Sequence, residues 1–194
     1  MNVFGLIFFL LAWHIVVYCP VAHVLWNPHG FMLLRDVQDF AGGAVVHMLV
    51  SATVLAMHLF LTHKDAPNYS VKIPNNSQSA LYFALLIWFL SVAMYAGKSH
   101  DASPVAAQAL VNTFVAVQIS VLVGYLVDLC YNREVADTPV SMVNSIMLGL
   151  VSAAPGCGYS TVGGAMVSAV VTSIFTKLFA RLLLRDGGDP HDPL

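Results

Sequence analysis

Charge is the scarcest property of this 194-residue chain. Only 9% of its residues are Asp, Glu, Lys or Arg, whereas soluble globular domains carry about 25%. Hydrophobic residues make up 58% of the chain, so water cannot solvate most of its surface. The formal net charge of −2 supplies no basic field for nucleic acid. These shortages exclude a nucleic-acid-binding protein and favour one whose partner is a lipid bilayer.

Cysteine is scarce as well, and Cys19, Cys130 and Cys157 each lie in or beside an apolar run. They form no CxxC pair and their number is odd, which argues against a disulfide framework. The apolar runs also lack HxxxH, HxxE and clustered carboxylates, whereas a metal site needs three or four convergent ligands. We therefore expect no metal, no cofactor and no enzyme activity.

Long apolar runs take the place of charge. A helix that crosses a membrane needs about 20 mostly apolar residues, and barrel strands would instead alternate apolar with polar positions. Six runs of the first kind are present, at about residues 3–26, 40–61, 80–97, 105–129, 140–159 and 163–184. Since backbone in hydrocarbon must satisfy its own hydrogen bonds, these runs predict helices. The sequence predicts an all-α, polytopic transmembrane helical bundle, one membrane domain over 1–194 with a polar tail at 185–194.

The basic residues predict the orientation, because cytoplasmic loops of membrane proteins carry an excess of Lys and Arg. With the amino terminus inside, only Arg35 and Lys98 fall on the outside. The six on the inside are Lys64, Lys72, Arg133, Lys177, Arg181 and Arg185. An even number of spans then places the carboxyl terminus inside too. We expect a multi-pass protein of the plasma or inner membrane with both termini in the cytoplasm.

Histidines inside the second span are costly in lipid and therefore informative. His47 and His58 are 11 residues apart, which puts them on one face of a helix, about 16 Å apart. A stripe of this kind could line a path through the bundle. Each ring could instead hydrogen-bond a neighbouring helix and do nothing more. The residues alone leave both interpretations open.

Other polar positions have plain structural interpretations. Asp39 directly precedes the second span, where an Asp side chain accepts hydrogen bonds from free backbone N–H groups. Gln108 and Asn112 in the fourth span are expected to tie helices together rather than to bind a solute. The run from Pro155 to Gly164 contains four glycines and predicts a tight turn or a broken helix.

Several strings, in this order and spacing, resemble the ammonium transporter family (Amt/Mep/Rh type). The Asp39–His47 string resembles the family's fifth-helix signature nearly residue for residue. The other strings are Tyr18–Trp26 (end of the fourth helix), Ala109–Thr113 (seventh), Ala154–Tyr159 with Val162–Ala165 (loop between the eighth and ninth), and Arg181–Leu183 with Asp189–Pro190 (before the tenth). The resemblance covers essentially the whole chain.

The resemblance implies an architecture. Members of the family have about eleven helices in two inverted halves, and they assemble as trimers with one pore in each subunit. Inverted repeats place the solute site near the membrane midplane, between the halves. This chain would supply the fourth to ninth helices, so a truncated transporter is expected, as a homotrimer or in assembly with full-length homologues.

The resemblance also implies roles for three residues. His47 is similar to the first of the family's paired pore histidines, which can pass a proton or shape a path for ammonia. Trp26 matches the aromatic of an outer recruitment site, where a ring face attracts ammonium by about 2 kcal/mol. Asp39 matches a carboxylate that organises the outer vestibule without binding ammonium directly. The expected function is transport of ammonium or ammonia through a histidine-lined pore.

Two positions depart from the family pattern. Met94 stands where the family has a second gate phenylalanine, and Lys98 stands where it has a small hydroxyl residue at the recruitment site. An ammonium group of Lys98 would repel a cation there, by about 3 kcal/mol at about 5 Å, or would imitate it. The alternative expectation is a non-conducting subunit or sensor that keeps the fold but has lost conduction.

Overall fold

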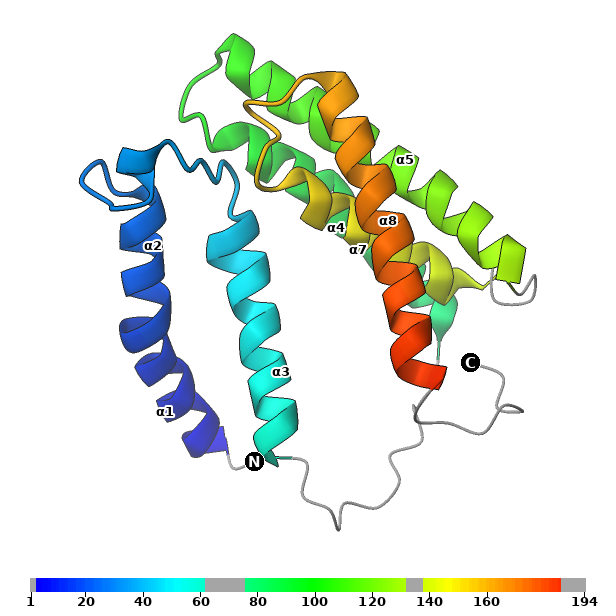
Figure 1. Ribbon diagram of the computed structural model, residues 1–194, viewed down its shortest axis with the longest axis horizontal. Helices are drawn as coiled ribbons and strands as arrows, with labels where there is room; N and C mark the ends of the chain where they lie inside the picture. Colours follow the sequence, from blue (N-terminus) through cyan, green and yellow to red (C-terminus); the bar gives the residue numbers. More distant parts are fainter. Residues whose placement is uncertain (1–2, 62–75, 132–137, 186–194) are drawn as a thin grey trace. The chain divides into compact units, whose positions relative to one another are not determined.

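A computed structural model describes residues 3–61, 76–131 and 138–185, without the side chains of His58, Leu61 and residues 183–185. These residues are mostly helical and include no strand, which confirms the all-α prediction (Figure 1). Four of the described helices are long and apolar enough to cross a membrane, and two more are apolar but shorter. The chain divides into two compact units, Met1–Asn68 and Tyr69–Leu194. A single domain over 1–194 stays a prediction.

The first unit opens with one continuous span, Val3–Trp26. It consists of α1 (Val3–Trp13), a π-helical turn η1 (His14–Tyr18) and α2 (Cys19–Trp26). The wider turn comes directly before Pro20, which has no N–H and would crowd the carbonyl four residues earlier in a regular helix. The Cys19 N–H accordingly bonds to the carbonyl of His14, five residues back. The helix thus passes the proline without ending.

The second helix of this unit starts later than expected. The prediction placed a span from residue 40, but the helical structure begins with a π-helical segment, η3 (Gly43–Met48), and continues as α3 (Leu49–Leu61). Gly42 has φ +95°, a left-handed conformation that no helix can continue through. Residues 40–42 therefore belong to the connection that enters the helix.

The second unit is a bundle of α4 (Ser77–Gly97), α5 (Pro104–Tyr131), α7 (Pro139–Ala153) and α8 (Val162–Arg185). Asn76 caps α4 by accepting from the Ser79 N–H at 3.0 Å. Thr138 caps α7 by accepting from the Ser141 N–H at 3.2 Å, with Pro139 as its first helical residue. In Figure 1, α8 (orange) lies against α7 and the lime-coloured half of α5.

Small residues let α5 approach its neighbours closely. Its buried positions recur every three or four residues and are mostly small or polar: Ala109, Asn112, Thr113, Ala116, Val117, Ser120, Gly124 and Asp128. Across from it, a Cβ on Gly149 of α7 would lie 2.5 Å from the Val117 Cα. Packing of this kind holds helices together in lipid, where burial of apolar area between them has little driving force.

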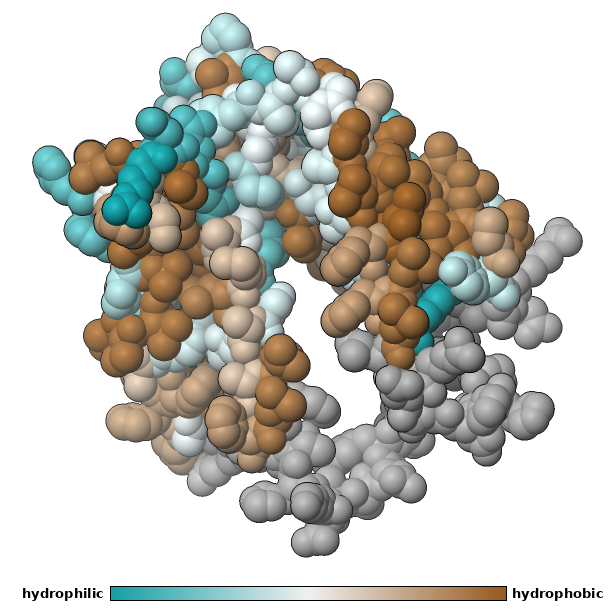
Figure 2. Space-filling model, viewed as in Figure 1, coloured by the Kyte–Doolittle hydropathy of each residue, from teal (hydrophilic) through white to brown (hydrophobic). Residues whose placement is uncertain are grey.

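The predicted fifth span, 140–159, is shorter in the structure because α7 ends at Ala153. Pro155 cannot donate a helical hydrogen bond, and a series of turns follows, with the Tyr159 and Ser160 N–H groups bonded to the Gly156 carbonyl. The predicted turn or broken helix between the fifth and sixth spans is confirmed. The described helices expose many apolar side chains, as the brown faces of α8 and α1 show in Figure 2.

Candidate functional site

Asp39 organises the helix start that carries His47. Its carboxylate accepts three backbone N–H groups: Gly43 at 2.6 Å, Ala44 at 2.8 Å and Val45 at 3.0 Å. These donors have no partner within the helix, and a carboxylate beside the positive end of the helix dipole is favoured. Asp39 is 7% exposed. The expected capping role is confirmed, although Gly42 holds the cap position and Asp39 acts from three residues before it.

Trp26 is attached to the same connection. Its indole N–H donates to the backbone carbonyl of Asp39 at 2.6 Å, across 13 residues of sequence. This bond fixes the end of the first span against the entry of the second. Trp26 and Asp39, which the sequence singled out separately, therefore belong to one local structure.

Gly42 is required where these parts meet. Besides its left-handed φ, a Cβ at this position would lie 2.7 Å from Val46 Cγ2 and 3.5 Å from Trp26 Cζ2. A side chain would thus press on the first turn of the helix and on the indole ring. The glycine lets the connection turn sharply between Asp39 and the helix that it caps.

His47 is half-buried and lies in the π-helical turn that follows the capped start. Single π-helical turns within helices occur frequently at functional sites. An open groove of about 540 Å³ lies between the first span and α3, and Leu49, two residues after His47, is one of its lining residues. The full lining is Phe9, Trp13, Val17, Leu49, Ala52, Thr53, Ala56, Met57 and Phe60. Trp13 and Thr53 join its two walls through an indole N–H to hydroxyl bond of 2.9 Å. The His58 side chain lies outside the described residues, so the shared histidine face stays a prediction.

Met94 and Lys98 belong to the second unit, at the carboxyl end of α4. Met94 is 63% exposed. Lys98 is half-buried and occupies the position directly after the helix, where its backbone N–H bonds to the Tyr95 carbonyl at 3.2 Å. Their expected places in an outer vestibule stay predictions.

Asn112 and Gln108 hold α5 to the turns that follow α7. The Asn112 amide donates to the carbonyls of Cys157 at 2.8 Å and Ser160 at 2.7 Å, and the Gln108 amide donates to the Ser160 carbonyl at 2.5 Å. Both side chains serve backbone groups that the broken helix would otherwise leave unpaired. The expectation that they tie helices together is confirmed.

A buried ionic cluster in the second unit was missed by sequence reasoning. Asp128 of α5 binds the Lys177 ammonium, the Ser141 hydroxyl and, at 2.8 Å, the Arg181 guanidinium. The Asp128 side chain is 6% exposed and that of Lys177 is 10% exposed. An Asp near the end of an apolar span was the available signal, because intramembrane charges are paired. From the sequence, Lys177 and Arg181 indicate only the orientation of the chain.

Comparison with known proteins agrees with this architecture. The sequence profile of the Ammonium Transporter Family matches residues 1–193. An ammonium transporter of Aquifex aeolicus is 30% identical over 86% of this chain, and ammonium transporter MEP2 of Saccharomyces cerevisiae is 28% identical over 88% of it. The crystal structure of Saccharomyces cerevisiae Mep2 matches 91% of this chain with a TM-score of 0.82 and 26% identity. That of Candida albicans Mep2 matches the same share with a TM-score of 0.81 and 27% identity.

Long apolar helices, with most of their buried polar groups paired inside the protein, define a multi-pass α-helical membrane protein. Within that class, the chain belongs to the Ammonium Transporter Family. It spans 38% of the length of the Aquifex aeolicus relative, 35% of yeast MEP2 and 40% of the yeast Mep2 crystal chain.

Proposed function

We propose that this chain takes part in the transport of ammonium or ammonia across a membrane, with His47 beside the path and Trp26 at its outer entrance. The observation that supports this most directly is the structure around Asp39. One residue holds the Trp26 ring through its backbone carbonyl and the start of the His47 helix through its carboxylate. In a family of transporters, residues tied together in this way are candidates for one solute path.

The three side chains would have distinct tasks. The Trp26 ring offers an aromatic face, which attracts a cation such as ammonium most strongly where water is excluded. His47 can accept or donate a proton on either ring nitrogen near neutral pH, which suits a path that handles ammonium and its neutral base. Asp39 positions both, because all three of its carboxylate bonds go to backbone donors rather than toward a solute.

The orientation and assembly that we propose follow the sequence and the family. Both termini lie in the cytoplasm of a plasma or inner membrane, which places Trp26 and Lys98 outside. The assembly is a homotrimer or a complex with longer homologues. Met94 and Lys98 line the outer vestibule, where Lys98 tunes the attraction for a cation through its own charge.

A growth assay tests the transport proposal. The chain is expressed in cells that lack their own ammonium transporters, with ammonium as the sole and limiting nitrogen source. We expect the unaltered chain to support growth. His47→Ala and Trp26→Leu should each reduce the initial uptake of labelled methylammonium, an analogue of ammonium, at least about tenfold. Leu59→Ala, an exposed residue on α3, is the matched control and should leave uptake unchanged.

Two results would contradict the proposal. In the first, uptake persists at the wild-type rate in both variants, so that neither residue lies on the path. In the second, the unaltered chain reaches the membrane in folded form and neither transports by itself nor changes the uptake of a co-expressed longer homologue.

A further inference from the structure

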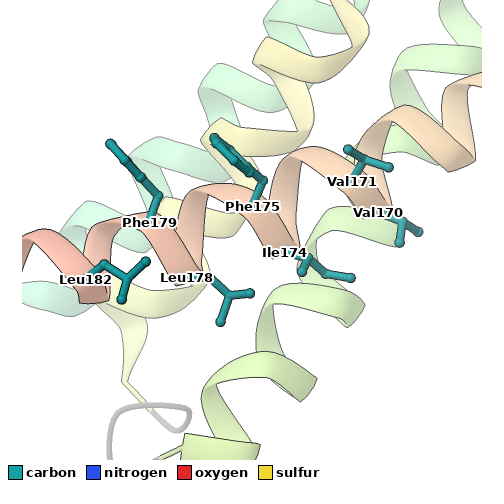
Figure 3. A pocket seen from close by; sticks show the side chains of 7 residues that line it. All are labelled: Val170, Val171, Ile174, Phe175, Leu178, Phe179 and Leu182. Carbon is teal, nitrogen blue, oxygen red and sulfur yellow. The ribbon is translucent and has the colours of Figure 1, made fainter.

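Lys177 carries its ammonium group into the interior of the second unit. It follows Ala169 and Ser173 at four-residue intervals along α8, and both of these residues are 0% exposed. The Lys177 side chain itself is 10% exposed. The apolar side chains that Figure 3 shows projecting from α8 belong to other positions of the same helix. A primary ammonium group is thus held inside the protein, on the face of α8 that packs against α5.

Two oxygen groups receive this ammonium. Lys177 Nζ donates to Asp128 Oδ2 on α5 and, at 3.2 Å, to the hydroxyl of Ser141 on α7. Ser141 in turn donates its own hydroxyl proton to the same oxygen of Asp128. The Asp128 side chain is 6% exposed, and Ser141 is also 6% exposed. A buried carboxylate and a buried hydroxyl, bonded to each other, therefore form a cradle for a hydrogen-bonding cation.

Gly124 of α5 makes room for the stem of Lys177. A Cβ at this position would lie 3.1 Å from Lys177 Cε and would also press on the Ser145 side chain. Even the smallest side chain would therefore force its neighbours to shift. The glycine leaves space beside α5 for an unbranched alkyl chain that ends in an ammonium group.

Arg181 already supplies Asp128 with a countercharge. Its Nη2 donates to the other carboxylate oxygen, Oδ1, at 2.8 Å, and its Cζ lies 4.1 Å from the centroid of the Tyr131 ring. Lys177 is thus the second cation on a carboxylate that carries one negative charge. What Lys177 adds is N–H donors at Oδ2 and at the Ser141 hydroxyl, and an untethered ammonium ion has the same donors.

We propose that Asp128 Oδ2 and the Ser141 hydroxyl form a binding site for a primary ammonium ion, and that Lys177 occupies this site as an internal ligand. Free ammonium and short alkylammonium ions offer the same group without the tether. A tethered group has a high effective concentration, so Lys177 keeps Asp128 closed to free ammonium in the unaltered chain. The site belongs to the second unit, whereas Trp26 and His47 belong to the first, so it would stand if the transport proposal failed.

Chemical rescue of Lys177→Ala tests the site. The purified full chain is unfolded by heat in detergent, with chloride salts at about 100 mM and equal ionic strength. We expect the substitution to lower the transition temperature by about 4 °C or more, because buried acceptors lose their donor. Propylammonium replaces the atoms from Cγ to Nζ and should restore at least about half of this loss. Ammonium should restore less, because it leaves the space of the stem empty.

Matched controls separate an ammonium site from a general need for positive charge. Tetramethylammonium has the same charge as propylammonium but no N–H donor, so it should restore nothing. Lys177→Met removes the same charge as Lys177→Ala but fills the space with an unbranched side chain, so propylammonium should not raise its transition temperature. The unaltered chain should not respond either, because Lys177 is already in place.

A second measurement keeps the test decisive if Lys177→Ala unfolds during purification. The variant is solubilised in each salt, and its monodisperse fraction is measured by size-exclusion chromatography. Propylammonium should raise that fraction at least about twofold over tetramethylammonium.

Three results would overturn the proposal. Propylammonium and tetramethylammonium could have equal effects on Lys177→Ala, Lys177→Met could respond to propylammonium as strongly as Lys177→Ala, or Lys177→Ala could be as stable as the unaltered chain. In the first two cases the cation acts through charge or through the solvent, and in the third the cradle needs no occupant.

Discussion

Asp39 in the first unit and Asp128 in the second are both buried acidic residues, 7% and 4% exposed as whole residues, in a chain with few charges. They are stabilised in different ways. Asp39 receives three backbone N–H groups from residues four to six positions later in the sequence. Asp128 receives side chains from two other helices, 13, 49 and 53 positions away.

The difference shows two routes by which an apolar protein can keep a carboxylate inside. Backbone donors at a helix start exist wherever the helix begins, so Asp39 needs only the correct local turn. Side-chain cations must themselves be buried in the same low-dielectric region, and burying a charge without its partner costs free energy. We therefore expect the Asp128 cluster to be far more sensitive to the loss of one member.

The largest effect is expected from Asp128→Asn. It leaves Lys177 and Arg181 partly buried without a countercharge, and breaking such a group costs about 3–5 kcal/mol. The free energy of unfolding in mixed micelles, followed by circular dichroism, measures it. Asp128→Asn combined with Lys177→Met should recover most of the loss because it removes one uncompensated cation. A single variant as stable as the unaltered chain would erase the distinction between the two carboxylates.

Asp39→Ala should cost less, about 2 kcal/mol, because it strands three backbone donors but no charge. Asp39→Asn keeps one acceptor oxygen, and Asn is as good a capping residue as Asp, so about half of that loss is expected. The same unfolding measurement applies. If the Asn variant unfolded as easily as the Ala variant, the negative charge rather than capping geometry would be what the site requires.

Gly42→Ala tests how much the left-handed turn before the His47 helix contributes to stability. A non-glycine residue at φ +95°, with its Cβ 2.7 Å from Val46, should lose about 1–2 kcal/mol. Gly163→Ala is the control, since nothing lies within 4 Å of a Cβ there, and it should change stability by less than about 0.5 kcal/mol. Thermal unfolding of the two variants, measured under the same conditions, tests this expectation. Equal transition temperatures would contradict a requirement for glycine in the turn at position 42.

The smallest effect is expected where single hydroxyls join helices. Thr53→Val removes the 2.9 Å bond from Trp13 in the first unit, and Ser173→Ala removes the 2.7 Å bond to Ser120 in the second. Interhelical bonds of this kind contribute about 0.6 kcal/mol in membranes. Thr53→Ser, which keeps the hydroxyl, should behave as the unaltered chain. A loss above about 2 kcal/mol in either unit would mean that hydroxyl bonds rival the ionic cluster.

Much of the fold was predictable, because long apolar runs in lipid permit little except helices. The predicted ends were less reliable. The second span starts at Gly43 because the backbone at Gly42 is left-handed. Helix α7 ends at Ala153 because turns follow at Pro155. In both places the apolar sequence by itself predicts a longer helix. The spacing of apolar residues does not distinguish the π-helical turns at His14–Tyr18 and Gly43–Met48 from ordinary α-helix, so the sequence did not predict them.

The candidate site divides in the same way. Capping by Asp39 followed from its place before a helix, and the ties made by Gln108 and Asn112 followed from amides in an apolar span. The bond from Trp26 to the Asp39 carbonyl did not, because it depends on how a connection of irregular backbone folds. The roles of His47, Met94 and Lys98 along a solute path stay predictions.

The sequence by itself determined the helical class, the family and the local cap at Asp39, since each depends on composition or on residues within a few positions of one another. Only the tertiary structure decided that Asp128, Lys177 and Arg181 form one cluster. The physical reason is the sequence separation of the groups that interact. Hydrogen bonds at a helix start are made within one turn, whereas the pairing of buried charges depends on which helix faces come together, and small residues along α5 set that packing.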